Sequence, residues 1–132
     1  MDTVNIFQNV KQIIVVNETL KQPKKKRAAQ MAQASAGAFF EAGKDVKKAW
    51  LKEGRPKIVL KALGADDLRD LLSKAEKRKL PIYLVEDKVR PSSATATVAC
   101  LGIGPVCDEQ VNQMMDIFNY YCWVRENAFN VR

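Results

Sequence analysis

Three polar residues stand at helical spacing within residues 24–40, which read KKKRAAQMAQASAGAFF. Lys26, Gln30 and Gln33 fall at i, i+4 and i+7, so an α-helix places them along one face. A cation and two amides can bind and orient a polar substrate, and this row is therefore the first candidate for a functional site. Most of the remaining residues are small or apolar, which predicts a helix that can approach a sheet closely.

The chain contains no histidine, and this absence excludes several kinds of chemistry. Ser-His-Asp and Cys-His nucleophilic catalysis are excluded, and so is the side chain most often used as a general base. Hydrolytic chemistry would have to rely on carboxylate, lysine, amide, hydroxyl or main-chain groups. Three irregularly spaced cysteines (Cys100, Cys107, Cys122) predict no disulfide framework, and without histidine a zinc site would need an unusual ligand set. We expect neither a metal site nor a cofactor.

The net charge of +7 is unevenly distributed along the chain. Residues 11–61 contain 13 Lys and Arg against four Asp and Glu, whereas the rest of the chain contains nine against eleven. A basic first half favours one cationic face, which suits a polyanion such as RNA or DNA. The alternative is that surface lysines only keep a small protein soluble.

Composition and length predict a single globular domain, because 132 residues with 47% hydrophobic and 28% charged residues are an ordinary combination. No apolar run approaches the roughly 18 residues of a membrane span, and we expect no membrane contact. The first residues, MDTVNIFQNVKQ, lack the order of a signal peptide. Together with the few cysteines, this favours a reducing, cytoplasmic location.

Strand and helix patterns alternate along the chain and define the elements that must position the polar row. We expect strands at residues 11–16, 57–63, 82–86 and 96–103, and helices at 24–42, 44–52, 65–79 and from about 108 to 121. Gly43 is expected to cap the first helix, and Gly104-Pro105 to end the last strand. The order β-α-α-β-α-β-β-α predicts an α/β three-layer sandwich, with a mixed, about four-stranded central sheet and helices on both faces.

Four blocks in this order resemble the type 2 peptidyl-tRNA hydrolases of archaea and eukaryotes. The blocks are KQIIVVNETLK, KRAAQMAQASAGAFF, WLKEGRPKIVLK, and LPIYLVEDKVR followed by TVACLGIGP. The second resembles the family pattern K-x-A-A-Q-x-x-H-A-x-x-G-A-aromatic, and the last pair resembles its D-x-G-R-T-Q loop and T-V-T-V-L-x-I-G-P strand. The resemblance covers residues 11–121 and implies that they form a domain like that of the type 2 peptidyl-tRNA hydrolases. Residues 1–10 would then be an N-terminal arm, and residues 122–132 a C-terminal extension.

The resemblance implies a site made by Lys26, Gln30 and Asp87, which stand unchanged at family functional positions. Asp87 would act as base or position a water, Lys26 would stabilise an oxyanion or bind a phosphate, and Gln30 would position the ester. Lys24, Lys25, Arg27 and Arg90 are the candidate RNA contacts, and Gln33 and Thr97 are candidate substrate-positioning residues.

The sequence also departs from the family pattern. Gln33 replaces the family histidine, Pro91 and Ala99 replace two threonines, and Val89 replaces the glycine of the acidic loop. Gln33 can donate and accept hydrogen bonds but cannot take up a proton at neutral pH.

Two functions therefore remain open. The first is a divergent peptidyl-tRNA hydrolase, active or with reduced activity, that cleaves the ester between peptide and tRNA by attack of water. The alternative is a catalytically inactive relative that binds tRNA or another RNA, or serves as a protein-interaction module. Lys26 would then be one more solvated cation, and Asp87 would cap a turn or pair on the surface. Because family members form dimers, the resemblance also implies a homodimer.

Overall fold

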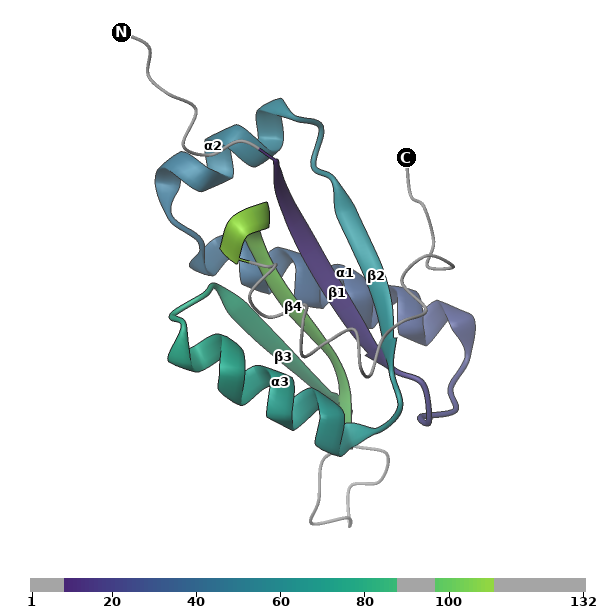
Figure 1. Cartoon of the computed structure of the whole chain (residues 1–132). Coiled ribbons are helices and arrows are strands. Elements are labelled where there is room, and N and C mark those ends of the chain that lie inside the picture. Colours follow the sequence, from purple (N-terminus) through teal and green to yellow (C-terminus); the bar gives the residue numbers. More distant parts are fainter. Residues whose placement is uncertain (1–8, 88–96, 111–132) are drawn as a thin grey trace, which may run out of the picture.

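The structure, a computed structural model, describes residues 9–87 and 97–110. Its centre is a four-stranded sheet with the strand order β2-β1-β4-β3 (Figure 1). The strands are β1 (Val10–Asn17), β2 (Lys57–Ala62), β3 (Ile82–Asp87) and β4 (Thr97–Cys107). β1 pairs with β2 in parallel and with β4 in antiparallel orientation, and β3 and β4 are antiparallel. The predicted mixed sheet of four strands is confirmed.

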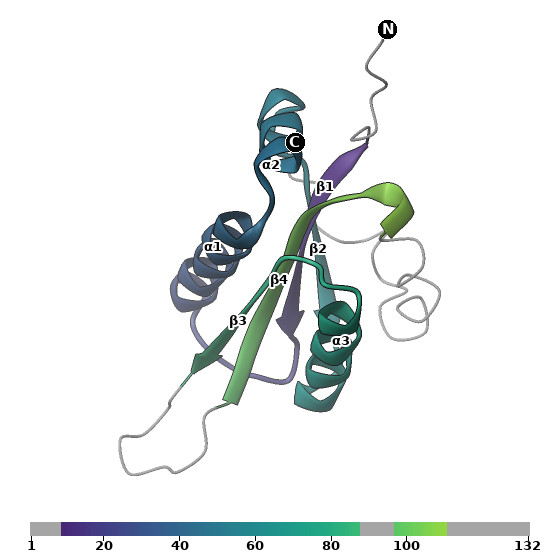
Figure 2. The same ribbon diagram turned by 90° about the vertical axis from the view of Figure 1, so that its left-hand side faces the viewer.

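Helices cover both faces of this sheet. α1 (Lys24–Glu41) and α2 (Lys44–Lys52) lie on one side, and α3 (Ala65–Lys77) lies on the other (Figure 2). Leu68, Leu71 and Ala75 form the buried stripe of α3, with acids in its first turn and lysines in its last turn, as its sequence pattern predicts. The expected three-layer α/β sandwich is thus confirmed.

Each face of the sheet carries its own hydrophobic core because successive strand residues point to opposite sides. Ile13, Val15 and Leu101 belong to the core beneath α3, whereas Ile14 and Cys100 belong to the core beneath α1. β1 and β4 are therefore buried on both faces, which explains the continuous apolar runs that predicted buried strands.

Small residues let α1 lie unusually close to the sheet. A Cβ atom added at Gly102 of β4 would overlap the backbone carbonyl of Ala34 in α1. A Cβ added at Gly37 of α1 would overlap the ring of Tyr83 in β3. The small-residue pattern of α1 therefore has the role that the sequence predicted for it.

A buried amide on β1 also joins α1 to the sheet. Gln12 is fully buried, and its Nε2 donates to the carbonyl oxygens of Ser35 (2.9 Å) and Gly104 (3.0 Å). The Ser35 hydroxyl in turn donates to Gln12 Oε1 at 2.5 Å. This cluster of Gln12, Ser35 and Gly104 leaves the buried amide fully bonded.

Two sequence-based expectations about element ends are wrong. β4 does not stop at Gly104-Pro105 but continues to Cys107, because a register shift opposite residues 11–13 of β1 accommodates the proline, which has no N–H to donate. Gly43 does not adopt a left-handed cap, since its φ is −69°; it is instead the N-cap of α2. The other predicted boundaries differ by at most two residues.

Several predictions concern residues that the structure does not describe. These are the arm before residue 9, Arg90 and the rest of the loop at 88–96, and the helix and tail beyond residue 110. The helical turn at 108–110 agrees with the predicted start of that last helix. Among the described helices, none is long and apolar enough to cross a membrane.

Candidate active site

A lysine from α1 and a carboxylate from β3 meet at one end of the sheet. Lys26 lies in the first turn of α1, and Asp87 is the last residue of β3. Lys26 Nζ lies 3.0 Å from Asp87 Oδ1, and the Asp87 side chain is only 12% exposed while that of Lys26 is 47% exposed. Two of the three predicted catalytic residues are therefore in direct contact, although they are far apart in the sequence.

Gln30 lies one helical turn beyond Lys26 and faces the sheet. It is 7% exposed, and its Oε1 accepts a hydrogen bond from Gln22 Nε2 at 2.6 Å. Gln22 comes from the loop before α1, and its own Oε1 is buried without a hydrogen-bond partner among the described residues. Gln22 was not predicted as part of the site, and nothing in its spacing indicated that it would contact Gln30.

The loop between β1 and α1 is held in place by a network around Asn17. Asn17 Nδ2 donates to the Val98 carbonyl of β4 at 2.9 Å, and Asn17 Oδ1 accepts from the backbone N–H (3.0 Å) and hydroxyl (2.7 Å) of Thr19. This Asx-type turn fixes the chain on its way to the start of α1.

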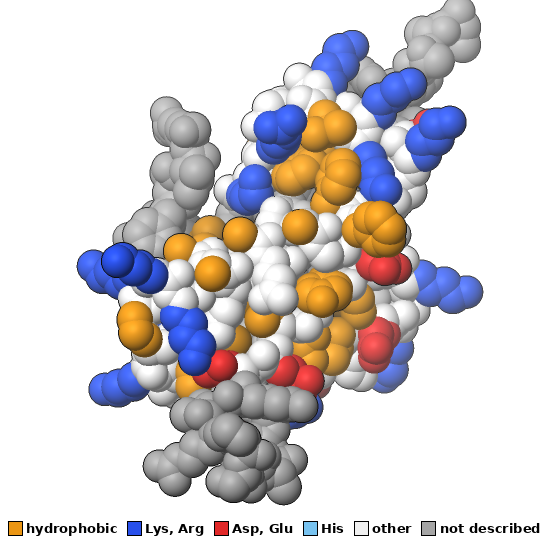
Figure 3. Space-filling view, turned by 180° about the vertical axis from the view of Figure 1, so that it is seen from behind, with side chains coloured by type: hydrophobic (Ala, Val, Ile, Leu, Met, Phe, Trp, Pro, Cys, Tyr) orange, Lys and Arg blue, Asp and Glu red, His pale blue; other side chains and the backbone are white. Residues whose placement is uncertain are grey.

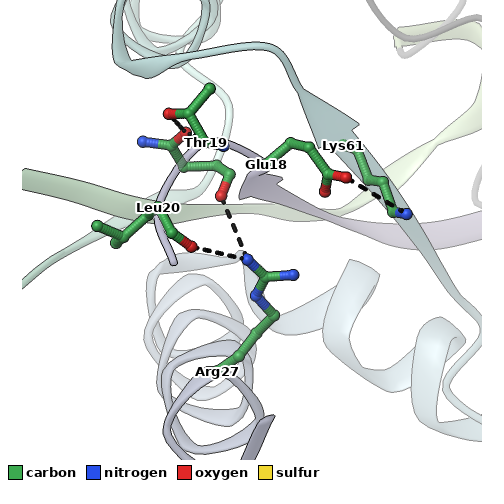
Figure 4. A network of polar contacts seen from close by, with 6 residues as sticks. Glu18, Thr19, Leu20, Arg27 and Lys61 are labelled. Carbon is green, nitrogen blue, oxygen red and sulfur yellow. Dashed lines mark hydrogen bonds and ion pairs between the residues drawn. The ribbon is translucent and has the colours of Figure 1, made fainter. Parts of the chain in front are cut away.

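Arg27 strengthens the same loop from the helix side. Its guanidinium donates to the carbonyl oxygens of Leu20 (3.0 Å) and Asn17 (3.5 Å), as Figure 4 shows beside the Glu18–Lys61 ion pair. Arg27 therefore has a structural role in positioning α1, and its contact with RNA stays a prediction. Lys24 and Lys25, the other predicted RNA contacts on α1, are exposed.

The remaining predicted residues take different places around the site. Thr97 is the strand partner of Asp87 and is partly buried, so it lies at the same end of the sheet. Gln33 is exposed on α1, so the predicted row is divided by burial: Gln30 faces the protein and Gln33 faces solvent. Arg90 lies outside the described residues.

The cysteine near the site is not a nucleophile at neutral pH. Cys100 Sγ donates to the Gln30 carbonyl at 3.4 Å. Burial raises the pKa of Cys100 to about 12, and the positive charge of Arg27 opposes this only in part. The thiol therefore remains protonated and acts as a small core residue that touches the backbone of the site helix.

A metal-binding cluster is not formed by the described residues, in which no three His, Cys, Asp or Glu side chains gather. The chemistry that the described geometry offers is that of a mostly buried carboxylate, a partly exposed lysine ammonium group and a buried amide. Such a set can orient a water molecule and stabilise negative charge on an oxygen. The fold and this site together define a small α/β sandwich protein with a carboxylate, an ammonium group and an amide near one end of its sheet.

Comparison with known proteins shows which family the chain belongs to. Residues 10–121 match the model of the family described as peptidyl-tRNA hydrolase PTH2. A peptidyl-tRNA hydrolase of Methanopyrus kandleri is 43% identical over 107 residues, covering 79% of this chain and 91% of the relative. That of Haloquadratum walsbyi is 36% identical over 112 residues, covering 85% of this chain and all of the relative. The chain belongs to the PTH2 family of peptidyl-tRNA hydrolases.

Proposed function

We propose that this protein hydrolyses the ester bond between a peptide and the terminal ribose of tRNA, with Lys26, Gln30 and Asp87 as its catalytic residues. The observation that carries the proposal is the 3.0 Å contact between Lys26 and Asp87 beside the buried Gln30. Relatives of this chain from Methanopyrus kandleri and Methanothermobacter thermautotrophicus are named peptidyl-tRNA hydrolases, which supports the same activity.

Asp87 is suited to hold the attacking water. One carboxylate oxygen accepts from Lys26, and a carboxylate has about four lone-pair sites, so Asp87 can also accept a hydrogen bond from water. The water oxygen attacks the ester carbonyl carbon while Asp87 takes up its proton. The bond to the ribose oxygen then breaks and that oxygen receives the proton from Asp87, which gives a tRNA with a free hydroxyl. The second proton of the water stays on the new peptide carboxylic acid, which releases it to solvent at neutral pH.

Lys26 and Gln30 stabilise charge around the reacting carbon. An ammonium group has three donors, so Lys26 can keep its contact with Asp87 while another N–H binds the oxyanion or a nearby phosphate. Gln30 is held by Gln22 at its Oε1, and its Nε2 is then the group that can bind the ester. Lys24 and Lys25 extend this cationic end toward the phosphates of the tRNA, and Arg90 is proposed for the same role from the loop after β3.

The surroundings of the reaction follow from its substrate. Because peptidyl-tRNA arises in translation, the proposal places the protein in the cytoplasm. We also propose a homodimer, which rests on family resemblance alone. The exposed Gln33 and the partly buried Thr97 are proposed as substrate-positioning groups.

Hydrolysis of a purified peptidyl-tRNA tests the proposal. Wild type is compared with Asp87→Ala and Lys26→Ala, and with Asp66→Ala, which removes an exposed carboxylate of α3 as a matched control. We expect release of peptide by wild type and by Asp66→Ala, and strongly reduced release by the two site variants.

Other results separate the alternatives. If wild type releases peptide no faster than buffer, the hydrolase proposal fails. Full activity of the Asp87 variant would remove the catalytic assignment while the activity stands. Tight tRNA binding that weakens steeply with salt, without turnover, would favour the inactive RNA-binding relative.

A further inference from the structure

The outer edge of β3 is unpaired within the described part of the chain. β3 is the last strand in the order β2-β1-β4-β3, and the ribbon views show it at the border of the sheet (Figures 1 and 2). An edge strand presents a row of N–H and C=O groups that can pair with another extended chain. This edge ends at Asp87, which is the proposed catalytic base.

The pairing of β3 with β4 shows which backbone groups face this edge. The N–H of Gly104 donates to the Pro81 carbonyl at 2.9 Å, so Pro81 and Gly104 form a pair whose backbone groups point toward each other. In an antiparallel ladder, inward-pointing and outward-pointing residues alternate along the strand. The register shift between Val85 and Glu86 places its extra residue, Ala99, on β4, so the alternation along β3 continues to Asp87. The N–H and C=O groups of Ile82, Leu84 and Glu86 therefore point to the free edge.

The flank of α1 beside this edge is lined by one row of side chains. The predicted polar row continues at the same spacing, so Lys26, Gln30, Gln33, Gly37 and Phe40 follow one another along the helix. Gly37 lies against Tyr83 of β3, which identifies this flank as the one that faces the β3 edge. Polar groups stand at its beginning, and the ring of Tyr83 packs over Gly37 farther along.

Two aromatic side chains lie exposed along the same flank. Tyr83 is 40% exposed and Phe40 is 78% exposed. On the face that α1 covers, hydrophobic side chains reach the surface among charged side chains of both signs (Figure 3). Tyr83 and Phe40 therefore offer apolar contact area beside the edge of β3.

We propose that the free edge of β3 binds the peptide part of peptidyl-tRNA as an added β-strand, with the ester at Lys26 and Asp87. The inference rests on the proposed function. The peptide ends at its ester carbonyl, and β3 ends at Asp87, so the peptide runs parallel to β3 while the tRNA continues beyond Lys24 and Lys25. Binding through main-chain groups suits an enzyme whose substrates carry peptides of many sequences, because every peptide presents the same backbone.

Other surfaces of the described structure fit this role less well. The free edge of β2 is separated from β3 by two strands, or about 14 Å at the usual strand spacing. The apolar hollow of about 510 Å³ between α1 and α2 has Ile14 and Val59 in its lining, so it opens on the β1–β2 side of α1. The Lys26–Asp87 pair lies on the opposite, β3 side.

The length of β3 sets the size of the subsite. Six residues of strand extend over about 20 Å, so about six peptide residues can pair with the edge. In a parallel ladder only alternate residues of the added strand bond to β3 through both their N–H and C=O groups. Binding should therefore strengthen with peptide length up to about six residues, and it should depend on backbone N–H groups with a period of two.

The test uses tRNA analogues whose peptide is joined to the terminal ribose through a non-hydrolysable amide. Affinity is measured for peptides of one to about eight residues, and for a long peptide in which each residue in turn is N-methylated. We expect affinity to rise up to about six residues, and methylation at alternate positions to weaken binding roughly 2- to 12-fold, the effect of one lost hydrogen bond. Affinity that is independent of length and of N-methylation overturns the proposal.

A variant of β3 tests the protein side of the same contact. Glu86→Pro removes one outward N–H without removing a bond to β4, whereas Glu86→Ala removes only the exposed side chain. We expect Glu86→Pro to weaken binding of the six-residue analogue roughly 2- to 12-fold more than Glu86→Ala, and both to bind the one-residue analogue alike. Equal binding of the long analogue by both variants contradicts the proposal.

The rate of amide hydrogen exchange at Leu84 shows directly whether a ligand pairs with the edge of β3. It is measured on the wild-type protein, so it does not require a variant to fold. The Leu84 N–H should exchange quickly in the free protein and slowly with the six-residue analogue, but not with the one-residue analogue. Protection without any ligand, together with a dimer in solution, would mean that a second copy covers β3 and would overturn the proposal. Binding that depends on peptide length, without hydrolysis, would support the peptide subsite on β3 and contradict the proposed hydrolase activity. Hydrolysis by a protein whose binding does not depend on peptide length would support the activity and contradict the subsite.

Discussion

α1 is joined to the sheet by two polar clusters that differ in almost every physical respect. The cluster of Gln12, Ser35 and Gly104 is neutral and buried, and each amide group of Gln12 has a partner at 2.5–3.0 Å. The cluster of Lys26 and Asp87 is charged, and almost half of the Lys26 side chain is exposed. The Gln12 cluster has the features of a contact that stabilises the fold. The Lys26–Asp87 pair, in contrast, can form further hydrogen bonds with a ligand.

The difference shows how a buried polar group can be assigned to stability or to function. A fully bonded buried amide has no capacity left for a substrate, and its removal leaves its former partners unpaired. A partly exposed ion pair contributes little to stability because water screens it. Stability should therefore depend on Gln12 and activity on Asp87, and each dependence can be measured without the other.

The largest expected effect is the loss of hydrolysis in Asp87→Asn. The amide has the shape of the carboxylate but cannot take up a proton, and general-base catalysis contributes roughly 10²- to 10⁴-fold to a rate. We expect kcat to fall by that factor, as measured by single-turnover release of peptide. The free energy of unfolding should change by less than about 1 kcal/mol, because the pair is partly solvated.

As a control, the free energy of unfolding of Asp87→Asn is measured by denaturant unfolding of the same preparation. A variant that loses activity and also several kcal/mol of stability would mean that Asp87 belongs with Gln12 as a structural group. In that case the distinction between the two clusters would not hold.

The next largest effect concerns Gln12→Leu. The substitution leaves the Ser35 hydroxyl and two carbonyl groups without their partner in a buried place, and we expect a loss of about 2 to 4 kcal/mol in the free energy of unfolding. The kcat of the folded protein should be within about twofold of wild type. Ser35→Ala serves as the milder control, since it removes one hydroxyl and should cost about 1 kcal/mol.

The buried Cys100 predicts an effect that appears only at high pH. Its pKa is about 12 in the folded protein against 9.0 for an ordinary cysteine, so between these values the unfolded state loses the proton while the folded state keeps it. The contribution of Cys100 to the free energy of unfolding is therefore complete below pH 9. As the pH rises toward 12, this contribution is lost at up to about 1.4 kcal/mol per pH unit. The difference in stability between wild type and Cys100→Ala should shrink over this range in urea unfolding, and a constant difference would contradict it.

The smallest effect is expected from Gln33→His. Position 33 is exposed, so a restored ring would be solvated and would not replace Asp87 as the base. We expect kcat to change by less than about threefold at pH 8, measured beside Ala36→His as an exposed control on the same helix. A rise of tenfold or more with a new ionisation near pH 6.5 would move the catalytic base from β3 to α1.

Most of the fold could be predicted from local patterns. The apolar runs of β1 and β4 and the leucine stripe of α3 are strong signals because they follow directly from burial on two faces or on one. The end of β4 was predicted wrongly because Gly104-Pro105 is a typical breaker in isolation. Its accommodation depends on the register shift against β1, which is a property of the folded sheet.

The site was predictable only in part, for a similar reason. Helical spacing places Lys26 and Gln30 on one face, and resemblance to the family indicated Asp87. The contact of Gln22 with Gln30 and the hydrogen bonds of Asn17 are tertiary contacts, and the residue types at these positions do not predict them. Gln12 lies in an apolar run, and only the structure shows that Ser35 and Gly104 satisfy its amide.

The strand order has a consequence for synthesis of the protein on the ribosome. β3 contacts the rest of the sheet only through β4, although β4 follows β3 in the chain. During translation, Asp87 therefore emerges before the strand that holds it in the sheet. Lys26 and Asp87, 61 positions apart, can come together stably only after residues 97–107 have left the exit tunnel. The proposed catalytic pair should thus form only late in synthesis, after β4 has paired with β1 and β3.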